Sequence, residues 1–354
     1  MRVLRRSVTG LSLLAAVAAA PALAQQQQQQ QQQQQGGELN LYSSRHYDTD
    51  RTLYDTFTRE TGIRVRLIEG DADQLIERIR SEGANSPADV LITVDAARLA
   101  RAKEAGILRP VRSQVLETRV PASLRDPEGT WFGVSKRARV VMYDKQKGPP
   151  AGLARWEDLA DPRFRGQVCT RSSGHPYTIS LAASILAANG PETTERWARG
   201  VVENMARPPQ GGDRDQFRAI PAGQCQIAVS NTYYLGQMAV SQRPDDRAVA
   251  ERIGVLFPNA APGDRGAHVN VSGAGVVATA PNRDAAVRFV EYLTGARAQE
   301  IFAVGNMEYP VVEDAPVHPA LAAFGSFRED RLNAAEYAKL GPQALQIMQR
   351  AGWR

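Results

Sequence analysis

The sequence predicts an α/β protein of two lobes joined by a hinge of two strands. Strands and helices alternate from residue 38 onward, which is typical of a parallel sheet covered by helices on both faces. Two long strand-like segments then enclose a second alternating region, so we expect the chain to cross between the lobes twice. We place one lobe at residues 38–138 and 267–310. The other lobe takes residues 139–266 and 311–354, including the carboxyl-terminal helices.

The first lobe opens with three strand–helix pairs. Ile63, Val65 and Leu67 alternate with arginines, as in a half-buried strand, whereas "ADVLITVD" has the continuous apolar run of a strand buried on both faces. Leu53 and Phe57 share one helical face, and Gly62 closes that helix. The expected strands are residues 39–44, 63–70 and 88–95, and the expected helices are residues 48–62, 71–85 and 96–106.

The second lobe repeats the alternation between two long strands. The long strands are residues 137–145 and 268–280, and a helix at 283–295 follows the latter. Between them we expect strands at 166–173, from 224 to about 232, and at 252–258, and a helix at 176–189. Short helices after Pro310 are expected to pack back on a lobe.

The amino-terminal residues have the composition of an export signal. Arginines precede an apolar run that ends in "ALA", so residues 1–24 are predicted to be a signal peptide, of the general secretory or twin-arginine type. Removing them lowers the formal charge from +5 to +2, and no basic stripe for nucleic acid remains. Residues 25–37, a glutamine run and two glycines, are predicted to be a disordered tether. We therefore expect a monomeric periplasmic protein.

The chain has two cysteines, Cys169 and Cys225, both in segments expected to be strands. An oxidising compartment favours a disulfide between them, and two buried thiols are the alternative.

Five tyrosine and histidine residues lie where strands end or helices begin. The set consists of His46, Tyr47, Tyr177, Tyr233 and Tyr234. Ligands of α/β proteins bind at the carboxyl ends of the strands, so these residues are expected to line one cleft between the lobes. The tandem tyrosines could point the same way only if the strand ends near Thr232 and the chain turns there. Pro176 fits the first position of a helix, with His175 or Gly174 as its cap.

Phenols and one imidazole are a ligand set for a hard trivalent cation. A phenol ionises near pH 10, but direct coordination to Fe(III) stabilises the phenolate and releases its proton. Zinc would call for Cys and His, and calcium for Asp-rich loops, neither of which is present. Four phenolates and Fe(III) sum to −1, which Arg45 could offset. The alternative from pattern alone is an organic ligand held by the tyrosine rings.

The motifs "RHYDTD" and "NTYYLG" resemble those of the ferric-iron-binding periplasmic proteins of bacterial ABC importers, in particular the cyanobacterial group. The similarity runs from about Glu38 to the carboxyl terminus. It implies a type II periplasmic-binding fold, and it implies Fe(III) as the bound ligand of His46, Tyr47, Tyr177, Tyr233 and Tyr234. An inner-membrane permease and its ATPase are the implied partners. His175 and Pro176 depart from the family's usual Asn-Ile-like pair, which leaves open whether His175 approaches the metal.

Two rival functions remain open at this point. An enzyme is not expected, because no GxSxG, HExxH, Walker or dinucleotide-binding motif is present and five protein donors leave little room for a substrate on iron. A binding protein of the same fold for an organic solute or an anion is the closer alternative.

Overall fold

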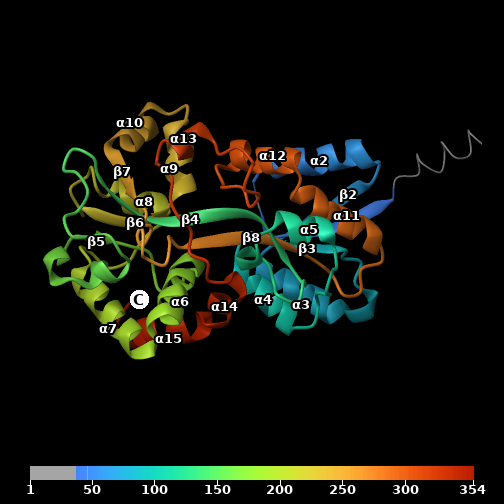
Figure 1. The fold of residues 1–354 in the computed structure, drawn as a ribbon, viewed down its shortest axis with the longest axis horizontal. Coiled ribbons are helices and arrows are strands. Elements are labelled where there is room, and N and C mark those ends of the chain that lie inside the picture. The colour runs from blue at the N-terminus through green and yellow to red at the C-terminus, as the bar shows by residue number, and fades with distance from the viewer. Residues whose placement is uncertain (1–36, 46) are drawn as a thin grey trace, which may run out of the picture.

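The computed structural model describes residues 37–45 and 47–354, which form a mixed sheet with helices gathered at its two ends (Figure 1). The predicted signal peptide, residues 25–36 of the predicted tether, and His46 lie outside the described residues. None of the described helices combines the length and the hydrophobicity needed to cross a bilayer.

One eight-stranded sheet runs through the molecule in the order β2-β1-β3-β8-β4-β6-β5, with β7 paired to β4. Its strands are β1 (Glu38–Ser43), β2 (Arg64–Glu69), β3 (Val90–Thr93), β4 (Phe132–Asp144), β5 (Val168–Cys169), β6 (Ile227–Asn231), β7 (Ile253–Leu256) and β8 (Val269–Val276). β1 is parallel to β2 and β3, and β5 is parallel to β6, as the alternating pattern predicts. All pairs that include β4 or β8 are antiparallel.

The two long strands connect the ends of the sheet. β4 pairs with β8 through residues 132–138 and with β6 and β7 through residues 139–144, so one strand belongs to both ends. In Figure 1, β4 and β8 lie side by side across the middle, between the two groups of helices. β4 begins at Phe132, five positions before the start expected from the sequence. The residue limits of the lobes stay a prediction.

One group of helices covers β1, β2 and β3. It contains α2 (Asp50–Thr61), α3 (Ala72–Glu82), α4 (Ala96–Glu104), α5 (Gln114–Arg119), α11 (Arg283–Leu293) and α12 (Ala296–Asn306). Leu53 and Phe57 of α2 are buried, and the Phe57 ring meets the Phe289 ring of α11 edge to face, with centroids 4.9 Å apart. Gly62 ends α2 in the left-handed conformation, as predicted. α12 was not foreseen from the sequence.

The second group surrounds β5, β6 and β7. It contains α6 (Pro176–Asn189), α7 (Pro191–Asn204), α8 (Asp213–Arg218), α9 (Thr232–Ala239), α10 (Pro244–Arg252), α13 (Pro319–Ala322) and α15 (Gly341–Arg350). α14 (Ala334–Lys339) contacts both α4 and α6 and so lies between the two groups. Four single-turn 3₁₀ helices complete the fold: η1 (Gly83–Asn85), η2 (Ala122–Leu124), η3 (Glu157–Ala160) and η4 (Pro162–Phe164).

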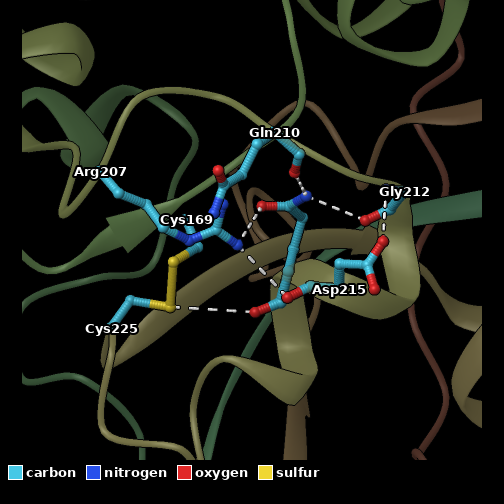
Figure 2. Close-up of a disulfide and its surroundings, with 7 residues drawn as sticks. Cys169, Arg207, Gln210, Gly212, Asp215 and Cys225 are labelled. Carbon is cyan, nitrogen blue, oxygen red and sulfur yellow. Dashed lines mark hydrogen bonds between the residues drawn. A yellow bond between two sulfur atoms is a disulfide. The ribbon is translucent and has the colours of Figure 1, made fainter.

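Cys169 and Cys225 form a disulfide, with their Cα atoms 6.0 Å apart (Figure 2). This confirms the pairing that an oxidising compartment favours. The expectation that both cysteines lie in strands was half wrong: Cys169 ends β5, whereas Cys225 lies in the loop before β6. Arg207 lies beside the bond and donates a hydrogen bond to Gln216 Oε1 at 3.3 Å.

Candidate metal centre

Tyr177 stands in the first turn of α6. Pro176 takes the first helical position, as predicted, since its fixed φ suits a helix start and it has no N–H to leave unpaired. Of the two candidate caps, the structure selects His175: its Nδ1 accepts a hydrogen bond from Tyr177 N at 3.3 Å. Burial, assisted by Arg171 and Arg139, lowers the pKa of His175 to about 3. A neutral imidazole with one nitrogen engaged as a cap is a positioning group for Tyr177.

Tyr233 and Tyr234 also stand in the first turn of a helix. β6 ends at Asn231 and α9 begins at Thr232, so the strand ends within one residue of the expected position. The chain turns at this point, as expected, because α9 begins directly after β6. Successive helical side chains are about 100° apart rather than opposed. The two rings lie together, with centroids 4.0 Å apart.

The phenol of Tyr177 meets this pair. Its oxygen lies 3.3 Å from the oxygen of Tyr233. Both helices present their amino-terminal turns to the same place, where the partial positive charge of a helix amino terminus favours an anionic oxygen. The structure therefore brings together three of the tyrosines predicted from the sequence.

Tyr47 approaches from the other group of helices. It lies between β1 and α2, where its carbonyl accepts a hydrogen bond from Asp50 N at 2.9 Å and its ring lies 4.9 Å from the Arg45 guanidinium carbon. An ionised Tyr47 raises the pKa of Tyr233, and an ionised Tyr177 raises that of Tyr47. The phenols of Tyr47, Tyr177 and Tyr233 thus lie within electrostatic reach of one another.

Burial favours the protonated form of the Tyr233 and Tyr234 phenols when no cation is present, because it raises the pKa of both. It is the largest cause that raises the pKa of Tyr233 far above its ordinary value and that of Tyr234 to about 12, and neighbouring tyrosines add to the effect. A site of this kind gains its charge only when a cation displaces the phenolic protons.

Beneath Tyr47 lies a buried network of charges that the sequence did not reveal. Arg45 Nε donates to Asp50 Oδ2 at 2.7 Å, and its Nη2 donates to Glu308 Oε2 at 3.0 Å. Glu308 also accepts from Arg137 Nη1 at 3.2 Å. Two guanidinium groups and two carboxylates cancel, so this network as a whole has no net charge, although the charge of Arg45 acts to lower the pKa of Tyr47 against the larger effect of burial.

A second network, beneath Tyr177, carries the surplus charge. Asp213 binds both Arg139 and Arg171, the latter at 2.8 Å. The guanidinium carbons of Arg137 and Arg139 lie 5.6 and 5.9 Å from the centre of the Tyr177 ring. The guanidinium groups of Arg139 and Arg171 against the single carboxylate of Asp213 leave one positive charge. This charge complements the −1 expected for four phenolates and Fe(III).

A cavity of about 470 Å³ adjoins Tyr177 and reaches the loop that follows β1. One part of its wall consists of charged side chains from β2, α4 and the loops that follow β1 and β2. The start of α6 forms another part. The lining includes Arg45, Glu69, Asp71, Arg98, His175 and Tyr177. Within residues 37–45 and 47–354, no cluster of three or more His, Cys, Asp or Glu side chains could hold a metal. Phenolate is therefore the donor type that this region offers in quantity.

Two groups of helices on one sheet, joined by two strands and with polar side chains converging between them, define a two-lobed ligand-binding protein. Residues 85–326 match the family described as bacterial extracellular solute-binding protein, and the chain belongs to that family.

Within this family, the relatives and the solved structures that are similar to the chain include iron-uptake and ferric-iron-binding proteins. The chain is 53% identical over 320 residues to Iron uptake protein A1 of Synechocystis, covering 90% of this chain and 88% of the relative. It is 29% identical to the major ferric iron-binding protein of Neisseria gonorrhoeae, over 77% and 81% of the two chains. A Trichodesmium structure in complex with iron and citrate superposes with a TM-score of 0.87 at 52% identity, covering 90% of this chain and all of that one.

The comparison confirms three predictions. The similarity to the ferric-binding group is confirmed by the relatives. The two-lobed type II fold is confirmed by the solved ferric-binding proteins, including one from Bordetella with a TM-score of 0.84 at 41% identity over 89% of this chain and 99% of that one. The relatives are named for iron uptake and iron binding, so the chain is a binding protein and not an enzyme.

Proposed function

We propose that this chain captures Fe(III) in the periplasm and delivers it to an ABC permease and its ATPase for iron uptake. Four phenolates, from Tyr47, Tyr177, Tyr233 and Tyr234, and the imidazole of His46 hold the ion. The proposed lobes, residues 38–138 with 267–310 and residues 139–266 with 311–354, close on the ion by a hinge motion about β4 and β8.

The observation that carries this proposal is the 3.3 Å separation of the Tyr177 and Tyr233 oxygens, with the Tyr234 ring packed against that of Tyr233 at a centroid distance of 4.0 Å. Two phenols this close cannot both ionise unless a cation sits against them. The surplus guanidinium charge around Asp213 supports an anionic iron–phenolate centre. The relatives named for iron uptake and ferric iron binding support the same cargo.

The test is to add ferric citrate to the purified chain and record its visible spectrum. We expect a phenolate-to-iron charge-transfer band that bleaches on acidification, because protons then compete with the metal for the phenolates. The Tyr233→Phe/Tyr234→Phe double variant keeps both rings and is expected to lose the band. A colourless wild-type protein in the presence of excess ferric citrate would overturn the proposal.

A second candidate is an organic solute or anion as the physiological ligand. The size of the cavity beside Tyr177, about 470 Å³, favours it, because this volume exceeds the need of a single ion. In that case the same double variant would retain its affinity, since the aromatic surfaces survive the loss of the hydroxyls.

A further inference from the structure

A row of buried polar side chains connects the two groups of helices beneath the tyrosines. It consists of Asp95, Asn270, Ser180 and His268, none of them more than 6% exposed. Asp95 caps α4, Asn270 lies in β8, His268 immediately precedes β8, and Ser180 lies in α6. None of the four belongs to the proposed iron ligands. Polar groups this deeply buried are costly unless each is hydrogen-bonded.

The hydrogen bonds of Asp95 and Asn270 have fixed directions. Asp95 Oδ1 accepts from Ala97 N at 2.8 Å, and Asp95 Oδ2 accepts from Asn270 Nδ2 at 2.6 Å. Asn270 Oδ1 accepts from Ala96 N at 3.3 Å and from Val271 N at 2.7 Å. Because backbone N–H groups can only donate, they determine which end of the amide is oxygen. The amide nitrogen therefore has one proton for Asp95 and one left over.

That second proton goes to Ser180. Asn270 Nδ2 donates to Ser180 Oγ at 2.9 Å, so the serine hydroxyl keeps its own proton for His268 Nε2, 2.8 Å away. In the neutral tautomer that carries its proton on Nδ1, His268 Nε2 accepts the hydroxyl proton of Ser180. This agrees with the direction of its pKa, which burial, assisted by Arg265 and Arg139, lowers to about 3. Hydrogen bonds thus run without a break from Asp95 through Asn270 and Ser180 to His268.

Ser180 links this row to the proposed iron site. It follows Tyr177 by three positions in α6, so the two side chains project from the same side of the helix. Its partner Asn270 is in turn hydrogen-bonded to the amino terminus of α4, which packs against β3 and β8. α14 covers the row: the Tyr337 ring lies 5.2 Å from His268, and its hydroxyl donates to Val269 O at 3.1 Å.

We propose that Ser180 is a positioning residue, which docks the start of α6 against α4 through Asn270 and so sets Tyr177 opposite Tyr47. The expected effect on iron retention rests on the proposed function. The docking of α6 against α4 does not, because it is a property of the chain alone. If α6 moves away from α4 as the lobes open, the hydrogen bond between Asn270 and Ser180 is lost. The row thereby favours the arrangement in which α6 and α4 lie together.

The chain supplies a matched control for Ser180. Ser184 lies one turn further along α6, is equally buried, and donates only to Leu181 O of the same helix, at 2.8 Å. Ser184→Ala therefore makes the same chemical change without touching the contact between the lobes. Ser180→Thr keeps the hydroxyl, and its extra methyl group has room, because Ser180 borders a cavity of about 440 Å³. It serves as the rescue variant.

The first measurement is the rate at which a chelator removes iron from the loaded protein, followed by loss of the visible band. Ser180→Ala is expected to release iron about tenfold faster than wild type, since it loses two hydrogen bonds from the closed form. Ser184→Ala and Ser180→Thr are expected to match the wild type. Equal rates in Ser180→Ala and Ser184→Ala would overturn the proposal.

The second measurement needs no iron. Spin labels on Glu104→Cys in α4 and Gln343→Cys in α15, both exposed, report the separation of the lobes in the apo protein, because the native cysteines are paired. Ser180→Ala is expected to shift the distances to longer values, and Ser184→Ala is expected to leave them unchanged. Coincident distributions overturn the positioning role. If wild type binds no iron, the proposed function fails while this measurement still decides the role of Ser180.

Discussion

The phenol oxygens of Tyr177 and Tyr233 lie 3.3 Å apart, although 56 positions separate the two residues in the chain. The disulfide repeats this relationship, since Cys169 and Cys225 are also 56 positions apart. Each cysteine precedes its tyrosine by eight residues, through the end of a strand and into the first turn of a helix. The disulfide and the contact between the phenols therefore join the same two segments at two points, eight residues apart along each.

Replacing Tyr177 by Phe tests whether that contact serves a metal. The ring and its packing survive, but one phenolate is lost. Removing a group that merely orients a metal ligand costs roughly 10- to 100-fold in affinity, so loss of a ligand is expected to exceed about 100-fold. Competition with a chelator, monitored by the visible band, measures this directly.

Tyr292→Phe is the control for this substitution. Tyr292 is also half-buried, its hydroxyl donates to Leu53 O at 3.1 Å, and it is not one of the proposed ligands. We expect Tyr292→Phe to bind iron as wild type does. A Tyr177→Phe variant that kept wild-type affinity would remove Tyr177 from the ligand set.

The arrangement of strands could be predicted where the pattern is local. Alternating and continuous apolar runs identify β1, β2 and β3, and the capping signals Pro176 and Gly62 mark helix ends correctly. The tandem tyrosines were harder. The sequence indicates where the strand ends, near Thr232, but aromatic residues favour strands, so the helix that holds Tyr233 and Tyr234 was not predicted.

The charge networks could not have been foreseen. Glu308 lies 263 positions from Arg45 and 171 from Arg137, and no local pattern connects residues that far apart. The role of Arg45 as the compensating cation stays a prediction, and its carboxylate partners Asp50 and Glu308 became visible only in the fold. The surplus charge on Arg139 and Arg171 depends on Asp213, which lies 74 and 42 positions from them in the chain.

Reducing the disulfide is expected to destabilise the fold. A cross-link that closes a loop of 56 residues lowers the entropy of the unfolded chain by an amount worth about 4 kcal/mol at 25 °C. The free energy of unfolding, measured with urea with and without a dithiol reductant, is expected to fall by up to that amount. In the Cys169→Ala/Cys225→Ala variant the reductant should have no effect, and an equal response there would contradict the assignment.

Gly275 tests the close packing of the hinge strand β8. A Cβ at this position would lie 2.7 Å from Thr130 O and 2.9 Å from Leu108 Cδ1, so the backbone must move to admit it. Gly275→Ala is expected to lower the free energy of unfolding by about 1–3 kcal/mol. At Gly37 an added Cβ meets no atom within 4 Å, so Gly37→Ala should be neutral. Equal stability of both variants in urea titrations would refute the packing argument.

Asp213 is expected to make stability depend on pH. Burial opposes its ionised form, but Arg139 and Arg171 outweigh burial and hold the pKa of Asp213 below its ordinary value. A carboxyl whose pKa is lower in the folded state stabilises the fold above the unfolded value of about 3.9. That contribution is lost as the pH falls through the folded value.

Asp213→Asn removes the charge at nearly constant shape and leaves the buried Arg139 without its carboxylate. The loss in unfolding free energy at pH 7 is expected to be about 3–5 kcal/mol, as for other buried pairs that lose one partner. Below pH 4 the wild-type carboxyl is itself progressively neutralised, so the difference between the two proteins should narrow. Asp246→Asn, in the more exposed pair with Arg218, should cost less at every pH. A difference between wild type and Asp213→Asn that is as large at pH 3 as at pH 7 would show that Asp213 acts through its shape and hydrogen bonds and not through its charge.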